Sequence, residues 1–117
     1  MTTAITRLPL SGSADGQGIK VAATTSPGTL VHTAHATATD EVWLWCVNSS
    51  ASSVKLTVQF GGTTDPDDSI EATIAAESGL FLIVPGLVLS NSKVVRAFAA
   101  TANVLACHGY VNRLVVS

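Results

Sequence analysis

The stretch EVWLWCVN, residues 41–48, has the composition of a β-strand but no polar face. Side chains alternate between the two faces of a strand, and a strand in a small protein usually presents one apolar and one polar face. Here both faces are apolar: Trp43, Trp45 and Val47 on the first, Val42, Leu44 and Cys46 on the second. We therefore predict a central strand. One face packs against an opposing sheet, and the other meets an N-terminal arm, a loop or a neighbouring subunit.

Short runs rich in Val, Ile, Leu and Thr recur on both sides of this stretch, between clusters of Gly, Ser, Asn, Asp and Pro. They predict eight strands: 19–24, 29–35, 41–48, 54–60, 69–75, 80–84, 94–99 and 104–116. Such spacing is typical of a sandwich or barrel, and eight strands in two sheets is the strand count of a jelly roll. We predict an all-β fold, a jelly-roll-like antiparallel β-sandwich.

The length of 117 residues predicts a single domain. Residues 1–18 carry no regular apolar pattern, and we expect them to form an extended N-terminal arm, in which Pro9 fits an extended path. Residues 19–117 then form the single β-sandwich domain. Within the arm, Arg7 and Leu8 are candidate anchors onto a neighbour.

The low charge of the chain limits the classes of partner that it can bind. Charged residues make up 12% of it, about half the roughly 25% of an average soluble domain, and the net charge is -2. No basic run supports contact with a phosphate backbone, and no stretch of apolar residues is long enough to span a membrane. We predict neither a nucleic-acid nor a membrane partner, and a surface that repels its neighbours weakly.

Residue patterns for catalysis or metal binding are sparse. His32 and His35 are three residues apart and so lie on opposite faces of a strand. The acidic stretch 65–68 lacks the ligand spacing of a calcium loop, and no serine lies in a nucleophile elbow. We predict no enzyme activity, no metal and no cofactor, and we interpret Cys46 and Cys107 as buried thiols.

Trp43 and Trp45 share one face of one strand, which allows two interpretations. They form an interface anchor, since tryptophan is frequent in interface hot spots, or they form a stacking platform for a sugar. Their neighbours along the strand, Val42, Leu44 and Val47, favour packing. A carbohydrate-binding β-sandwich module remains the alternative.

The phrases ITRLPLSGSADGQGIKVAAT near the N-terminus and VVRAFAATANVLACHGYVNRL near the C-terminus resemble a family of small structural proteins of tailed phages and prophages. The middle section, VQFGGTTDPDDSIEATIAAESGLFLIVPGLVL, fits the same pattern, so the resemblance covers nearly the whole chain. Many such β-sandwich proteins are capsid decoration or cement proteins, and others are head–tail connector, tail or fibre components.

The resemblance implies a virion protein on the capsid surface, made in the cytoplasm of the host bacterium. Its partners are the major capsid protein and further copies of itself, in a trimer or dimer. No catalytic residue is carried over. Combined with the residue patterns, it predicts a partner-binding set: Arg7, Leu8, Trp43, Trp45, Tyr110, Asn112, Arg113 and Leu114.

Overall fold

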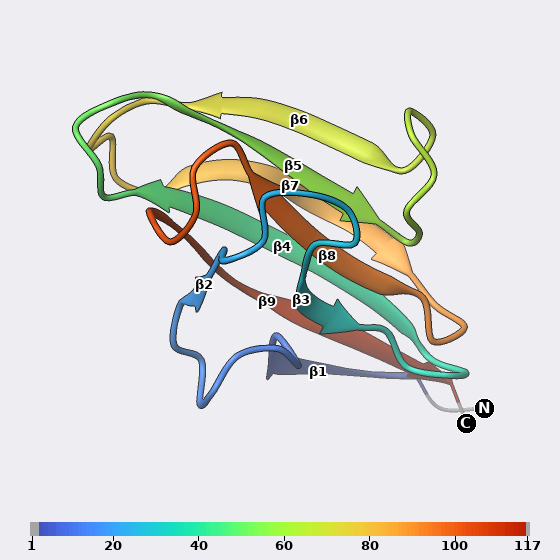
Figure 1. The fold of residues 1–117 in the computed structure, drawn as a ribbon. Helices are drawn as coiled ribbons and strands as arrows, with labels where there is room; N and C mark the ends of the chain where they lie inside the picture. The colour runs from blue at the N-terminus through green and yellow to red at the C-terminus, as the bar shows by residue number, and fades with distance from the viewer. Residues whose placement is uncertain (1–2, 117) are drawn as a thin grey trace.

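The computed structural model describes residues 3–116, and every regular element in this span is a β-strand (Figure 1). The strands are β1 (Thr3–Pro9), β2 (Ile19–Lys20), β3 (Thr29–Thr33), β4 (Thr39–Asn48), β5 (Val54–Phe60), β6 (Ser69–Ile74), β7 (Phe81–Leu89), β8 (Val94–Ala99) and β9 (Leu105–Val116). The predicted all-β fold is confirmed. Among the residues described, no helix is long and apolar enough to cross a membrane.

The strands form two antiparallel sheets that stack face to face (Figure 1). The first has the order β1-β9-β4-β7, and the short β2 also pairs with β9. The second has the order β3-β8-β5-β6. Each pairing runs antiparallel, and the longest joins β4 and β9 from Thr39↔Leu114 to Asn48↔Leu105. The chain is therefore a β-sandwich, as predicted.

The pairings are nested along the sequence. If β1 and β2 are read as one interrupted strand, the first strand pairs with the last, β3 with β8, β4 with β7 and β5 with β6. This is one long antiparallel ribbon, rolled so that alternate pairs enter opposite sheets. The strand order is that of a jelly roll, two Greek keys in two sheets.

The core lies between the sheets, and the inner strands build it from every second residue. In β4, Val42, Leu44 and Cys46 are fully buried, and Leu56 and Val58 of β5 are fully buried as well. The second face of β4, with Trp43 and Trp45, points away from the core and is partly buried. The two-faced apolar stretch thus meets the opposing sheet on one side only.

Two strands differ most from the predicted ranges, the other bounds differ by at most two residues, and β1 is a ninth strand beyond the eight predicted. β2 is two residues long, and the following residues 21–28 form a loop. β7 continues past Val84 through Pro85 and Gly86 to Leu89. Proline, which lacks an N–H, is accommodated because β7 is at the edge of its sheet, and Gly86 adopts a positive φ of 80° near a register shift against β4.

The N-terminal arm is extended from Thr3 to Pro9, and this part lies along its own chain as β1. Each residue of β1 has a partner on β9, from Thr3↔Val116 to Pro9↔Tyr110. Leu10 then enters the core, and a turn leads to β2. Met1 and Thr2, also assigned to the arm, lie outside the described residues.

Candidate interaction face

The outer face of the β1-β9-β4-β7 sheet concentrates apolar and aromatic side chains. We call this surface the aromatic face. It comprises the side chains of the alternation that points away from the core: Ile5, Arg7, Glu41, Trp43, Trp45, Leu82, Val88, His108, Tyr110, Asn112 and Leu114.

Three aromatic rings lie together at the centre of the aromatic face. Trp43 and Trp45 are two residues apart on β4, and Tyr110 is directly opposite Trp43 on β9. The ring centroids are 6.1 Å apart for Trp43–Trp45, 6.4 Å for Trp43–Tyr110 and 6.0 Å for Trp45–Tyr110. The guanidinium of Arg7 lies 4.8 Å from the centroid of Tyr110, within cation–π range. Such contacts hold the rings in a shared arrangement.

A chain of hydrogen bonds runs beside the rings. The Glu41 carboxylate oxygen Oε1 accepts from Trp43 Nε1 at 2.6 Å and from Asn112 Nδ2 at 3.0 Å. Asn112 Oδ1 in turn accepts from Arg7 Nε at 3.2 Å. The bonds from Trp43 and Asn112 lower the pKa of Glu41 from its ordinary value. The two charged groups of the face are thereby tied to its aromatic residues and to each other through Asn112.

Close packing also fixes Trp43 from the side of β7. A Cβ atom placed on Gly86 would lie 2.9 Å from Cζ2 of the Trp43 indole, so only glycine leaves room for the ring there. The positive φ of Gly86 favours the same residue. The bulged edge strand and the tryptophan therefore fit together as one surface.

Exposed aliphatic side chains extend the aromatic face away from the rings. Ile5 and Val88 are 71% and 61% exposed. Both line one hollow of about 120 Å³, together with Leu114, Thr39, Glu41 and Asn112. Single exposed apolar residues are ordinary, whereas large contiguous apolar patches are typical of interaction sites in proteins.

Most of the predicted partner-binding residues come together on this face: Arg7, Trp43, Trp45, Tyr110, Asn112 and Leu114. Leu8 and Arg113 do not. Each follows an outward residue by one position and so points inward, where Leu8 packs against the core. Sequence reasoning missed Glu41, although it has the same alternation as Trp43, and missed Ile5 and Val88, which become neighbours only through strand pairing.

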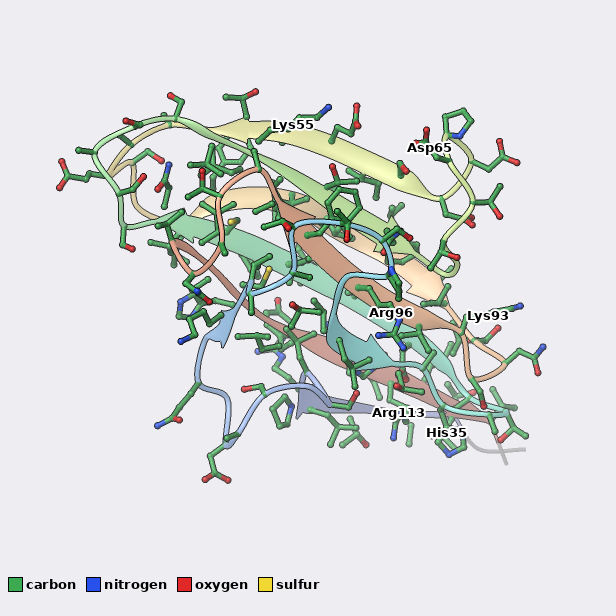
Figure 2. All side chains as sticks on the ribbon, viewed as in Figure 1. His35, Lys55, Asp65, Lys93, Arg96 and Arg113 are labelled. Carbon is green, nitrogen blue, oxygen red and sulfur yellow. The ribbon has the colours of Figure 1, made fainter. Side chains whose placement is uncertain are left out.

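Arg113 belongs to a buried polar cluster at one end of the sandwich; Figure 2 labels it there. Its Nε and Nη2 donate to the two carboxylate oxygens of Asp40 at 2.7 and 3.0 Å. His32 Nε2 lies 2.7 Å from Asp40 Oδ2, and His32 Nδ1 accepts the backbone N–H of Ser11 at 3.0 Å. Because Nδ1 is an acceptor here, Nε2 carries the proton and donates to Asp40.

Ser11, His32 and Asp40 have the composition of a hydrolase triad, but their bonding is different. The Ser11 hydroxyl oxygen accepts from the Thr33 N–H at 2.7 Å. The unprotonated nitrogen of His32, Nδ1, accepts from the backbone N–H of Ser11 and not from its hydroxyl. A nucleophile requires its base within reach of the hydroxyl proton. The contacts instead join the turn before β2 to β3, β4 and β9.

Opposing effects act on the Asp40 carboxyl, which is 0% exposed. Burial raises its pKa, but the hydrogen bonds from Arg113 and His32, together with the charge of Arg113, outweigh burial and hold the pKa below its ordinary value. The same contact with Asp40 raises the pKa of Arg113. The carboxylate and the guanidinium are therefore both charged at neutral pH.

The remaining candidates for chemistry are accounted for by local contacts. Cys46 and Cys107 are opposite each other on β4 and β9, both buried as free thiols, and the hydrogen bond to Cys46 together with burial raises the pKa of Cys107. In the acidic loop, Asp65 accepts from the Ser69 hydroxyl and Asp68 from the Thr64 N–H. Within residues 3–116, no group of three or more His, Cys, Asp or Glu side chains is placed to hold a metal ion.

Comparison of the chain with protein-family models, with curated proteins and with solved structures found no match. The function is therefore inferred from the sequence pattern and from the surface chemistry of the fold.

Proposed function

We propose that this protein is a phage virion structural protein, a capsid decoration protein that binds the major capsid protein shell through its aromatic face. The observation that carries the proposal is the packed group of Trp43, Trp45 and Tyr110 on the outside of a sheet, continued by the exposed Ile5 and Val88. No segment of residues 3–116 forms a further layer over this sheet.

The chemistry of the aromatic face suits a protein partner. Interface cores are enriched in Trp, Tyr and Arg and depleted in unpaired charge. Here Arg7 lies over Tyr110, and Glu41 is bonded to Trp43 and Asn112. Because these side chains already hold each other in place, docking orders few rotamers, which lowers the entropic cost of binding.

The proposed mechanism is mechanical. The nested antiparallel pairs join all strands of the jelly roll into two hydrogen-bonded sheets, which suits a structural role. A low net charge of -2 weakens the repulsion between neighbouring copies. Copies in a trimer or dimer at a symmetry axis of the shell each bury a moderate interface, and the contacts reinforce each other through multivalency. The added buried area resists the pressure of the packaged genome.

Copy number tests the assignment. We expect quantitative mass spectrometry of purified virions of the parent phage to find this protein in numbers comparable with the major capsid protein. A small number of copies would assign it to the connector or tail, and its absence from virions would reject a structural role.

The binding face is tested by replacing Trp45 with Ala. The ring lies at the centre of the aromatic face, and removal of a central interface tryptophan costs about 2 kcal/mol or more, or about 30-fold in affinity. Binding to undecorated capsids, measured by co-sedimentation, should fall by that factor. The matched control is Phe98→Ala, which removes an aromatic ring from the opposite sheet and should leave capsid binding unchanged. Equal loss in both variants would remove the aromatic face from the proposal.

A further inference from the structure

A second surface feature lies on the other side of the sandwich, on the outer face of the β3-β8-β5-β6 sheet. It is a hollow of about 360 Å³. Thr57, Gln59 and Phe98, from β5 and β8, belong to its lining. Residues of the loops 21–28 and 61–68 and of β6 complete it. Figure 2 labels two of the lining residues, Lys55 and Asp65, on the β5–β6 side of the molecule.

The burial of Thr57 and Gln59 is unusual for their position. They alternate with the core residues Leu56 and Val58 and therefore point away from the core. Outward polar side chains on a sheet are ordinarily exposed, yet these two are 4% and 3% exposed. Residues of the loops 21–28 and 61–68 surround Thr57 and Gln59, whose polar side chains therefore lie at the bottom of the hollow.

Hydrogen bonds hold both loops in place. Gln59 Oε1 accepts from the Gly28 N–H and Gln59 Nε2 donates to the Ser26 hydroxyl, both at 2.8 Å. In the other loop, the Ser69 hydroxyl donates to Asp65 Oδ1 at 2.9 Å. The hollow is thus formed before any ligand arrives, which is the ordinary condition of small-molecule sites. Its volume is at the lower end of the range of about 300–1,000 Å³ for such sites.

The lining selects among ligand classes. All its residues are polar except Phe98 and Ala100. The Lys55 ammonium is paired with Glu71 at 3.0 Å, so Asp65 gives the hollow an excess of negative charge that disfavours anions. The lining instead suits a neutral polyhydroxyl compound, because it offers hydroxyls, an amide, carboxylates and one aromatic ring. Carboxylates accept strong hydrogen bonds from hydroxyls, and the ring offers an apolar surface.

We propose that this hollow binds a short neutral saccharide. One face of a sugar ring packs on Phe98, and its hydroxyls bond to Thr57 at the floor and to Glu71 and Asp65 at the sides. The site is on the sheet opposite the aromatic face, so a copy docked on a shell through the aromatic face keeps the hollow open to solvent. The proposal goes beyond the decoration role and does not depend on it. It also differs from a sugar platform on Trp43 and Trp45.

The test uses the full chain and two NMR measurements, saturation-transfer difference and amide chemical-shift mapping. The probes are the methyl glycosides of glucose, galactose and mannose, N-acetylglucosamine, and the disaccharides maltose, cellobiose and lactose. Glucose 1-phosphate and N-acetylneuraminic acid are the anionic comparators. We expect at least one neutral probe to give saturation transfer and to shift amides in 24–28, 57–59 and 63–69, with weaker or no transfer to the anions. No binding by any neutral probe, or a preference for the anions, overturns the proposal.

A pair of variants in one exposed loop locates the site. Thr24 lines the hollow and Thr25, next to it, does not. Thr24→Trp fills the hollow and should weaken the best probe at least tenfold, whereas Thr25→Trp should leave its affinity within twofold. If Thr24→Trp changes the fold by circular dichroism, Glu71→Ala replaces it, with the same expected direction. Equal binding by the variant and the unmodified chain overturns the proposal, and loss on Trp43→Ala alone assigns the sugar to the aromatic face.

Discussion

Replacing Asp40 by Asn is expected to lower the free energy of unfolding by about 3–5 kcal/mol, the cost of leaving one partner of a buried ion pair without the other. Asp40 accepts both bonds of the Arg113 fork and the bond from His32, and it is completely buried. Because Arg113 is 24% exposed, water can solvate its unpaired charge in the variant, and we expect a decrease in unfolding free energy near the lower end of this range. Urea denaturation followed by tryptophan fluorescence measures it.

The exposed pair Lys55–Glu71 is the control for this prediction. Its side chains are about half exposed, and Glu71→Gln should change stability by less than about 1 kcal/mol, as surface pairs do. The double variant Asp40→Asn with Arg113→Met should recover part of the stability lost in the single variant, since no unpaired charge remains. A loss below about 1 kcal/mol in Asp40→Asn would contradict a stabilising role for the cluster.

The same contact predicts a pH dependence. The pKa of Asp40 in the folded chain lies below its ordinary value of 3.8, so the stability that it contributes is complete above that value and is lost as pH falls below it. The difference in unfolding free energy between the unmodified chain and Asp40→Asn should therefore be constant near neutral pH and shrink below 3.8. A difference that persists unchanged to the lowest accessible pH would contradict this assignment.

Replacing Gly109 by Ala is expected to destabilise the fold by about 3 kcal/mol or more, as severe overpacking does. Gly109 is opposite Leu44 on the central β4–β9 pairing. A Cβ atom there would overlap the carbonyl oxygen of Trp43 and lie 3.2 Å from the Leu44 Cα. Backbone atoms of a paired strand cannot rotate away as a side chain does, so β4 and β9 must separate locally.

Thermal unfolding by circular dichroism measures this effect against Gly16→Ala. Gly16 adopts a φ of 86°, but a Cβ there would have no heavy atom within 4 Å. The control therefore reports only the backbone cost of about 1–2 kcal/mol for a left-handed residue. Gly109→Ala should be clearly the worse of the two and should also shift the near-ultraviolet signal of Trp43. Equal effects would show that the close approach at Gly109 carries no penalty.

Much of the architecture was predictable because alternation and turn residues are local signals. The strand predicted at 54–60 coincides with β5, where outward polar residues alternate with buried apolar ones. The strand predicted at 94–99 coincides with β8, where Val95, Ala97 and Ala99 are buried on either side of Arg96 and Phe98. Local signals failed at Pro85-Gly86, which β7 passes through because it is an edge strand with a bulge. Whether a strand is at an edge is a property of the sheet and is not written in its own residues.

The interaction surfaces divide in the same way. The alternation of Trp43 with Leu44 is enough to place both tryptophans on one face of β4, but the neighbours of that face are set by register. Pairing with β9 and β1 brings Tyr110, Asn112 and Arg7 beside them. The hollow on the other sheet gave no sequence signal, because Thr24, Gln59 and Asp65 belong to separate segments that only loop packing brings together.

The all-β sandwich, the inward set of β4 and the apolar second face of the same strand were predictable from the sequence, because each of these depends on residues a few positions apart. Tertiary structure alone decided that Arg113 turns inward to Asp40, that β1 closes against β9, and that one sheet carries an aromatic face while the other carries a polar hollow. The reason is physical. Period-two alternation specifies which side chains share a face, but strand order and register specify which strands share a sheet.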